Sequence, residues 1–229
     1  MSHIHVWSVN LNGSILRSDQ VLGVLSIEEK SRAAKFKFER DRRRYIIAHA
    51  ALHDILAGYV NAAAADLRFV AGMNGKPSLA APLDASGVAF NLSHSHERAL
   101  IAVTPGRELG VDIEFSKIDF AFHEVAERFF TAREVAALRA LPAQLQRQAF
   151  YKCWTSKEAF LKAKGTGLSG QLDEVEISLT GDERVRIAAN VPGWSLAELT
   201  PGEGYEAALA TEGDPLAVIC YRWRRPPVP

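Results

Sequence analysis

The strongest pattern in the chain is a five-residue stretch near its middle, Gly110-Val111-Asp112-Ile113-Glu114. Polar and apolar residues alternate in it, and this period of two is typical of a β-strand. Asp112 and Glu114 should therefore project from one face, and Val111 and Ile113 from the other face into a core. Two neighbouring carboxylates repel each other, which favours a cation between them, and Mg²⁺ prefers oxygen ligands. The alternative is an edge strand with a solvated acidic face.

A helix further along the chain supplies a third carboxylate. The pattern of Arg147–Lys164 predicts this helix, and Gly165 is suited to end it. Glu158 and Lys162 lie on the same face as Leu161, so a charged pair shares the apolar stripe. Such an i, i+4 pair can also be an ordinary surface feature, which contributes only ~0.2–0.5 kcal/mol. Together with the acidic strand, however, Glu158 would give three hard oxygen ligands with positions left open for phosphate and water.

The first half of the chain combines a basic segment with a long helix. Residues 30–44 carry eight basic side chains and only two acidic ones. The apolar residues that follow recur at the spacing of a buried amphipathic helix, whose other face can hold the arginines in water. They are Tyr45, Ala48, Leu52, Ile55, Leu56 and Tyr59.

Short β-like runs fill both halves, and a helical region separates them. The turn-rich segment Thr104–Leu109 predicts a hairpin connector between its flanking strands. The region Phe122–Lys164 is helical, with breaks near Thr131 and Pro142. The predicted strands are Leu67–Ala71, Val88–Leu92, Ala99–Val103, Gly110–Glu114, Val175–Leu179, Arg184–Ala188, Leu196–Leu199, Tyr205–Ala210 and Ala217–Trp223.

This order of elements predicts an α+β fold made of two similar halves. Each half offers a long helix and several antiparallel strands. The segments Phe90–Thr104 and Tyr205–Tyr221 each consist of a strand, a polar loop and an apolar strand, which suggests an internal duplication. We place the halves at residues 1–114 and 115–229.

Composition narrows the class of protein. The chain has 229 residues, of which 48% are hydrophobic, and this is enough to bury a core. The 27 basic residues balance the 27 acidic ones, which argues against a general nucleic-acid binder. No apolar run approaches the roughly 20 residues that span a bilayer, and the first residues do not resemble a signal peptide. We therefore expect a cytoplasmic protein.

The acidic strand and the helix resemble, as a pair, the signature of Sfp-type 4'-phosphopantetheinyl transferases. The helical part of this signature runs from Phe150 to Lys162, with Trp154-Thr155-Ser156-Lys157-Glu158-Ala159 at its centre. The resemblance covers roughly residues 25 to 180. It includes Glu29-Lys30-Ser31-Arg32, Phe36-Lys37-Phe38, Gly75-Lys76-Pro77, Asn91-Leu92-Ser93-His94-Ser95, Arg128-Phe129-Phe130-Thr131 and Gly165-Thr166-Gly167-Leu168.

The resemblance implies a fold, a reaction and partners. Each member consists of two similar α+β halves related by a pseudo-twofold axis, with coenzyme A in the cleft between the halves. They move the phosphopantetheine arm of coenzyme A to a serine of an acyl or peptidyl carrier protein, with Mg²⁺ as cofactor, for which Mn²⁺ can substitute. The length does not suit the shorter, trimeric branch of the superfamily, so we expect a monomer. From the composition, we expect it to bind neither nucleic acid nor membrane.

The resemblance also implies roles for individual residues. Asp112, Glu114 and Glu158 would hold Mg²⁺, and Glu158 would act as ligand, as base for the serine hydroxyl, or as both. Lys157 and Lys162 would neutralise the departing nucleotide, with Lys162 favoured because it shares the face of Glu158. The positions that match nucleotide contacts are Arg32, Lys76, Ser93 and His94.

Simpler interpretations stay open at several of these positions. His94 and Lys76 could be ordinary turn residues. Glu134 follows Thr131 in a capping-box pattern, so it more plausibly caps a helix than binds metal. For the whole chain, the rival functions are a metal-dependent hydrolase of nucleotide pyrophosphates and a non-catalytic module that binds an acidic partner through residues 30–44.

Overall fold

The computed structural model describes residues 3–12, 21–72, 74–167, 172, 175–181, 185–189 and 191–224, and it confirms the α+β class. The helices are α2 (Ile27–Ala34), α3 (Glu39–Val60), α4 (Phe122–Phe129), α5 (Ala132–Ala140) and α6 (Ala143–Lys164). The strands are β1 (His3–Asn10), β2 (Phe69–Ala71), β3 (Pro77–Leu79), β4 (Val88–Ser95), β5 (Arg98–Pro105), β6 (Leu109–Phe115), β7 (Ile177–Thr180), β8 (Arg186–Ala189), β9 (Trp194–Leu199), β10 (Tyr205–Glu212) and β11 (Ala217–Arg222).

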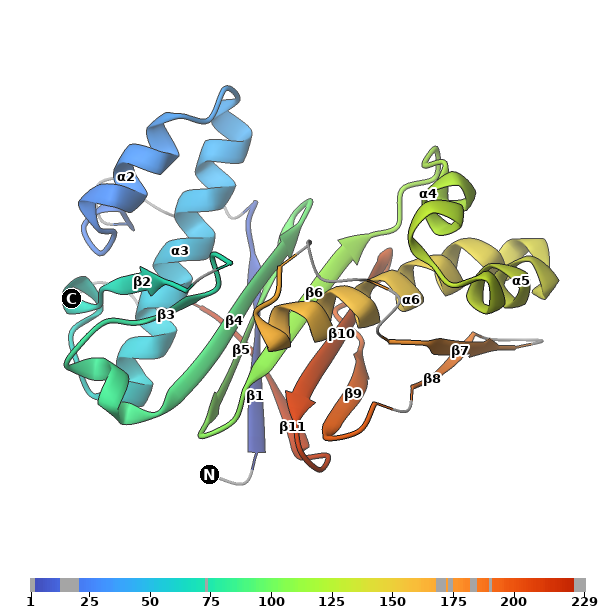
Figure 1. Ribbon diagram of the computed structural model, residues 1–229. Coiled ribbons are helices and arrows are strands. Elements are labelled where there is room, and N and C mark those ends of the chain that lie inside the picture. The colour runs from blue at the N-terminus through green and yellow to red at the C-terminus, as the bar shows by residue number, and fades with distance from the viewer. Residues whose placement is uncertain are drawn as a thin grey trace.

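Two sheets form the centre of the molecule (Figure 1). The first has the strand order β11-β1-β5-β4 and the second has the order β6-β10-β9. Strand β11 pairs in parallel with β1, whereas the other pairings in these two sheets are antiparallel. Two small hairpins, β2–β3 and β7–β8, lie outside them.

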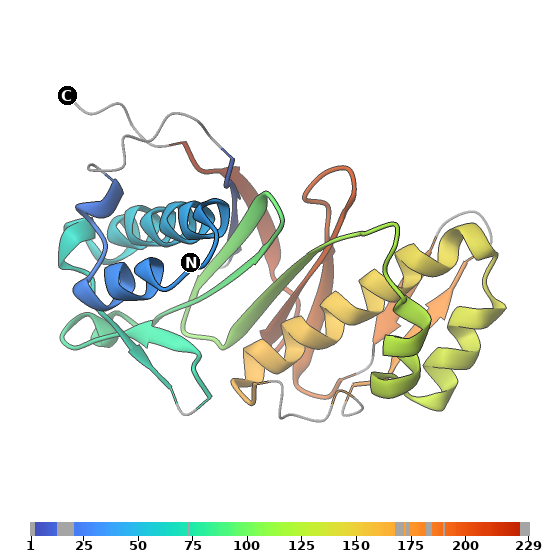
Figure 2. The same ribbon diagram turned by 90° about the horizontal axis from the view of Figure 1, so that it is seen from above.

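The sheets and helices stack in four layers, and the alternation of strand residues explains why. One set of β5 residues, including Ile101 and Val103, packs with α3, while Leu100 and Ala102 pack with Val111 of β6. The first sheet is therefore covered by α3 on one face and by the second sheet on the other. Helix α6 covers the remaining face of the second sheet (Figure 2). This layering is compatible with the expected pseudo-twofold relation.

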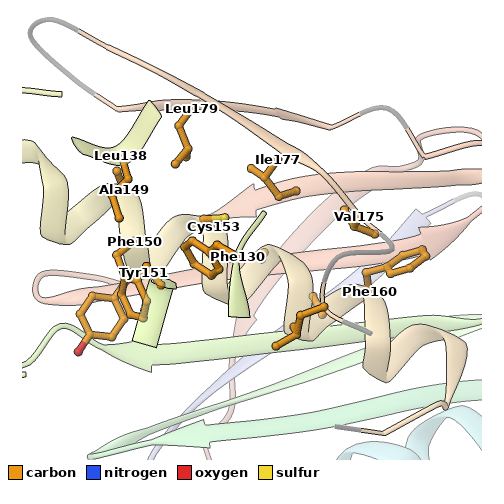
Figure 3. Packing of buried hydrophobic residues seen from close by; sticks show 14 of the residues in the cluster. Phe130, Leu138, Ala149, Phe150, Tyr151, Cys153, Phe160, Val175, Ile177 and Leu179 are labelled. Atoms are coloured by element: carbon orange, nitrogen blue, oxygen red, sulfur yellow. The ribbon is translucent and has the colours of Figure 1, made fainter. Parts of the chain in front are cut away.

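Helix α6 is the centre of the C-terminal core. Its residues 155–161 are all buried, because β6, β10 and the β7–β8 hairpin surround it. Figure 3 shows Cys153 of this helix beside Phe130, and Phe160 beside Val175. The helix ends as predicted at Gly165, which has a left-handed backbone and donates its N–H to the carbonyls of Leu161 and Lys162.

The predicted helices and most of the predicted strands are confirmed. The helical region 122–164 is interrupted at Thr131, which caps α5, and at Pro142, which precedes α6. On α3, the predicted apolar residues are buried except for Tyr59, which is half-buried. Strands β1 and β3 and helix α2 were not predicted, although β1 begins with alternating Ile4 and Val6 and α2 begins at a capping box.

One prediction about a connection is wrong. Residues 104–109 do not form a hairpin, since β5 pairs with β4 and β1 whereas β6 pairs with β10. The segments Phe90–Thr104 and Tyr205–Tyr221 are each a strand, a loop and a strand as predicted, although β4 and β5 pair whereas β10 and β11 lie in different sheets. Sheet membership also does not follow a division at residue 114, because β6 lies in the second sheet and β11 returns to the first.

Within the described part of the chain, no helix has both the length and the apolar character needed to cross a membrane.

Candidate active site

Strand β6 and helix α6 touch directly, and Gly110 makes this contact possible. A Cβ atom at this position would lie 2.1 Å from the carbonyl oxygen of Ala159 and 2.4 Å from the backbone nitrogen of Ala163. Only glycine fits so close to a helix backbone. Asp112 and Glu114 share the face of Gly110 because strand residues alternate, so both carboxylates run along α6. As predicted, Val111 and Ile113 are buried on the opposite face.

Four side chains from three elements form the centre of the site. Asp112 Oδ1 accepts hydrogen bonds from Lys162 Nζ at 2.6 Å and from Ser93 Oγ at 2.8 Å. Lys162 Nζ also donates to Ser93 Oγ at 3.0 Å. By contrast, Asp112 Oδ2 and Glu158 Oε1 are buried without a hydrogen-bond partner among the described residues. The name acidic cluster is used below for Asp112, Glu114 and Glu158.

The electrostatics of the acidic cluster disfavour three negative charges. Burial, together with the nearby charges of Asp112 and Glu114, raises the pKa of Glu158 to about 7, although Lys162 opposes the shift. Burial also raises the pKa of Glu114, and Asp112 adds to this effect, while a hydrogen bond from Ser95 opposes it. The cluster therefore lacks positive charge, and a cation would stabilise its ionised form.

The structure brings the predicted nucleotide contacts to the edge of this site. His94 is exposed near the end of β4, and its partial desolvation, with the charges of His49, Lys162, Arg44 and Arg32, lowers its pKa. Arg32 is exposed, and its guanidinium lies over the ring of Tyr45. Basic groups from α2, α3 and α6 thus lie around the end of β4 that carries His94.

Lys76 lies at a cavity between the two halves. Its Nζ donates to Glu108 at 2.6 Å and to the carbonyl of Ala163 at 2.9 Å. Ala163 directly follows Lys162 in α6. The cavity has a volume of about 570 Å³ and is also lined by Phe90 and Gly165. Lys76 is thus more than a turn lysine, because it joins the β2–β3 hairpin to the end of α6.

A second cavity lies on the other side of the acidic cluster. It has a volume of about 210 Å³ and borders Glu114. Its walls are largely aromatic and include Phe120, Tyr151 and Trp154. The two cavities thus lie at opposite ends of β6, the larger at Glu108 and the smaller, aromatic one at Glu114.

Comparison with known proteins gives a consistent family. Residues 108–210 match the 4'-phosphopantetheinyl transferase superfamily, and residues 16–106 match the family "4'-phosphopantetheinyl transferase, N-terminal". The chain is 37% identical over 210 residues to 4'-phosphopantetheinyl transferase HetI of Nostoc sp., covering 92% of this chain and 88% of that one. It is 30% identical over 170 residues to 4'-phosphopantetheinyl transferase Sfp of Bacillus subtilis, covering 74% and 73%.

A human relative extends the comparison beyond bacteria. This protein, L-aminoadipate-semialdehyde dehydrogenase-phosphopantetheinyl transferase, is 32% identical over 178 residues, which cover 72% of this chain and 56% of that one. The chain belongs to the 4'-phosphopantetheinyl transferase superfamily.

One lysine of the phosphopantetheinyl transferase signature does not reach the site. Lys157 has a side chain that is 0% exposed and pairs with Glu134 at 2.8 Å. It also donates to the carbonyls of Leu172 and Val175. The prediction that Lys157 contacts the nucleotide is therefore withdrawn, because no ligand can reach a fully enclosed ammonium group. Glu134 caps α5 as predicted and, in addition, accepts from Lys157.

The Asn-x-Ser-x-Ser part of the family signature has a role that sequence analysis missed. Asn91, Ser93 and Ser95 alternate along β4 and face β6, where each accepts a backbone N–H. They replace the backbone hydrogen bonds that β4 and β6 lack, since these strands belong to different sheets. The hydroxyl of Ser93 donates to Asp112 and accepts from Lys162 and from β6, so this hydroxyl is already fully used. The alternation of Asn91, Ser93 and Ser95 in the sequence could have indicated that these side chains share one face of a strand.

Proposed function

We propose that the chain transfers the 4'-phosphopantetheine arm of coenzyme A to a serine of an apo carrier protein and releases adenosine 3',5'-bisphosphate. One observation carries the proposal beyond family membership. Buried carboxylate oxygens of Asp112 and Glu158 have no partner among the described residues, directly beside Lys162. Buried polar atoms normally have partners, so these oxygens indicate a site built for a bound ligand.

The proposed metal is Mg²⁺, for which Mn²⁺ can substitute, and the donor set fits it. Asp112, Glu114 and Glu158 offer only carboxylate oxygens, which hard cations prefer. Among the residues described, no three acidic, histidine or cysteine side chains lie close enough to hold an ion unaided. Oxygens of the substrate would therefore have to complete the ligand set. When bound, the ion would neutralise charge on the pyrophosphate.

The protein's own residues can position the reacting groups. Lys162 faces the acidic cluster with a side chain that is 31% exposed, so its ammonium group can meet the pyrophosphate. The serine oxygen forms a bond to the β-phosphorus as the pyrophosphate P–O bond breaks, and the electron pair leaves with the adenosine bisphosphate. Glu158 accepts the serine proton directly or through a water. Fixed geometry and charge supply most of the acceleration.

The basic side chains around His94 and the aromatic cavity at Glu114 support a direction for coenzyme A. The nucleotide end would lie against Arg32 and His94 at the end of β4, because basic side chains suit phosphate groups. The thiol arm would extend past the acidic cluster toward the aromatic cavity at Glu114. In this orientation the scissile pyrophosphate lies between Lys162 and Glu158.

One chain supplies side chains from both halves to this site, which supports a monomer as the active unit. The halves that we assign to residues 1–114 and 115–229 would then form a single duplicated unit. We also propose a cytoplasmic location, since coenzyme A and newly synthesised carrier proteins occur there.

Intact mass measurement of a carrier protein tests this function. An apo carrier protein incubated with the chain, coenzyme A and Mg²⁺ should gain the mass of one phosphopantetheine group. A pyrophosphate hydrolase would consume coenzyme A and leave the carrier mass unchanged, which would refute transfer. Excess EDTA should stop the reaction and added Mg²⁺ or Mn²⁺ should restore it, whereas full activity without divalent metal would refute the proposed cofactor.

A further inference from the structure

A buried carboxylate from α2 lies between two histidines of α3. Glu29 Oε1 is 2.7 Å from His49 Nδ1, and Glu29 Oε2 is 2.9 Å from His53 Nε2. His49 and His53 are four residues apart, so they lie on the same face of α3. Glu29 also accepts the backbone N–H of Ser26 as part of a capping box. This set of Glu29, His49 and His53 is called the histidine–glutamate triad below.

His53 anchors the triad in the protein interior. Its ring is fully buried, and its Nδ1 lies 2.8 Å from the carbonyl oxygen of Ala64. Both ring nitrogens thus face acceptors, and carbonyl and carboxylate oxygens can only accept. Burial alone would raise the pKa of Glu29, but the hydrogen bonds from His49, His53 and Ser26 outweigh it and hold this pKa below its usual range. His53 therefore ties the Glu29 carboxylate to α3 inside the protein.

His49 is the member of the triad that can reach a ligand. Its Nδ1–H donates to Glu29, and its ring packs on Tyr45 with centroids 4.0 Å apart. The side chain is 21% exposed, in contrast to the enclosed His53. No hydrogen bond to its Nε2 occurs among the described residues. The ring is therefore held on one side and open on the other.

The open side of His49 lies in a strongly basic environment. Arg32 lies over the same Tyr45 ring on which His49 packs, and the charges of His49, Arg32, Arg44 and Lys162 all act on His94. Of these, Arg44 has a nearby acid, Glu97 at 3.7 Å, and Lys162 pairs with Asp112. Such a concentration of positive charge from both halves suits a phosphate group.

We propose that His49 is a further coenzyme A-binding residue, which donates from Nε2 to a phosphate oxygen of the nucleotide end, and that Glu29 is the positioning residue that orients it. This inference rests on the proposed function. A carboxylate on Nδ1 fixes the orientation of the His49 ring and leaves Nε2 to face the phosphate. His53 in turn keeps Glu29 ionised and attached to α3.

Steady-state transfer by the full chain tests the role of His49. His49→Ala should raise KM for coenzyme A by about 10- to 100-fold, the usual effect of one hydrogen bond to a charged group, and change kcat little. His49→Gln keeps a donor and should recover part of the loss. The matched control is His123→Ala, which removes an exposed histidine of α4. An unchanged KM in His49→Ala, or a loss confined to kcat, would overturn the assignment.

A second substrate identifies the phosphate. With 3'-dephospho-coenzyme A, the KM penalty of His49→Ala should vanish if the 3'-phosphate is the partner, and should persist if the pyrophosphate is. Transfer by the unmodified chain is measured first. Its absence would refute the proposed function, whereas normal transfer with an insensitive His49→Ala would refute only the present inference.

A double-mutant cycle tests whether Glu29 acts through His49. Glu29→Gln should raise KM for coenzyme A without a matching loss of kcat, and it should add nothing in the His49→Ala background. Fully additive effects on KM would contradict the positioning role. If Glu29→Gln does not fold, the comparison of His49→Gln with His49→Ala still decides the main assignment.

Discussion

Helix α6 carries two charged pairs that the protein treats in opposite ways. Lys157 is enclosed, and its ammonium group is satisfied by Glu134 and by two backbone carbonyls. Both oxygens of Glu134 also accept hydrogen bonds, from Ile177 and Thr131 among others. Five residues further along, Lys162 is partly exposed, and it faces carboxylates whose outer oxygens have no partner.

Whether a buried charged side chain has all of its hydrogen-bond partners distinguishes a structural role from a functional one better than the type of residue does. A buried pair with all of its hydrogen bonds made is at a local optimum and has no capacity for a ligand. A buried carboxylate oxygen without a partner raises the free energy of the folded protein until a ligand arrives. The same helix therefore anchors the C-terminal core at Lys157 and presents a reactive site at Glu158 and Lys162.

Gly110→Ala should damage both pairs together, because it displaces the helix that carries them. The new Cβ would meet backbone atoms of Ala159 and Ala163, which cannot rotate away. We expect a loss of unfolding free energy above the ~1–3 kcal/mol that is typical of overpacking, and a collapse of transfer activity. Denaturant unfolding measures the first effect. Wild-type stability in this variant would show that β6 and α6 do not touch as described.

Lys157→Met should separate the two pairs. It leaves Glu134 charged and buried without its cation, which should cost about 3–5 kcal/mol of unfolding free energy. Transfer per folded molecule should stay close to wild type, since Lys157 contacts no ligand. Lys164→Met, at an exposed position of the same helix, is the stability control. A large rise in KM for coenzyme A in a stable Lys157→Met protein would contradict this placement.

Substitutions of Arg32 and Lys76, at the edge of the site, should affect coenzyme A binding more than turnover. Arg32→Ala and Lys76→Ala should each raise KM for coenzyme A by about tenfold, because a charge-assisted contact to phosphate is lost, and lower kcat much less. Titration of initial rates with coenzyme A gives both constants. If both variants lost only kcat, the nucleotide would lie elsewhere.

Glu158→Gln should have a smaller effect, on stability, that depends on pH. The folded protein raises the pKa of Glu158 from its ordinary value of 4.5 to about 7, so the folded state holds this proton more tightly than the unfolded chain. Stability therefore falls as pH rises from 4.5 to 7. In EDTA, Glu158→Gln should increase Tm above pH 7 and leave it unchanged below pH 4.5. A decrease in Tm at pH 8 would mean that Glu158 is a satisfied structural residue like Glu134.

The acidic strand and α6 could be predicted from sequence because their signals are local. Alternation placed Asp112 on the face opposite Val111, and the C-cap glycine marked the end of α6. The burial of Lys157 could not be predicted, because adjacent residues of a helix point in different directions and only tertiary packing decides which are enclosed. Partners distant in sequence, such as Glu134 for Lys157 or Ser95 for Glu114, leave no local pattern.

Strand pairing shows the same limit. Strand β6 was predicted as a strand, but nothing near it in the sequence specifies β10 as its partner. The parallel return of β11 to β1 joins the two ends of the described chain and depends equally on the assembled core.

The most direct measurement compares transfer to an apo carrier protein by Asp112→Asn and by Lys157→Met, followed by intact mass and normalised to folded protein. Asp112→Asn keeps the size of the side chain but removes the charge that faces Lys162. Its rate should fall by at least about 10²- to 10³-fold, as when a fixed electrostatic group is lost from an active site, while Lys157→Met stays near wild type. Wild-type transfer by a folded Asp112→Asn protein, or a larger loss in Lys157→Met, would contradict the assignment of the acidic cluster as the active site.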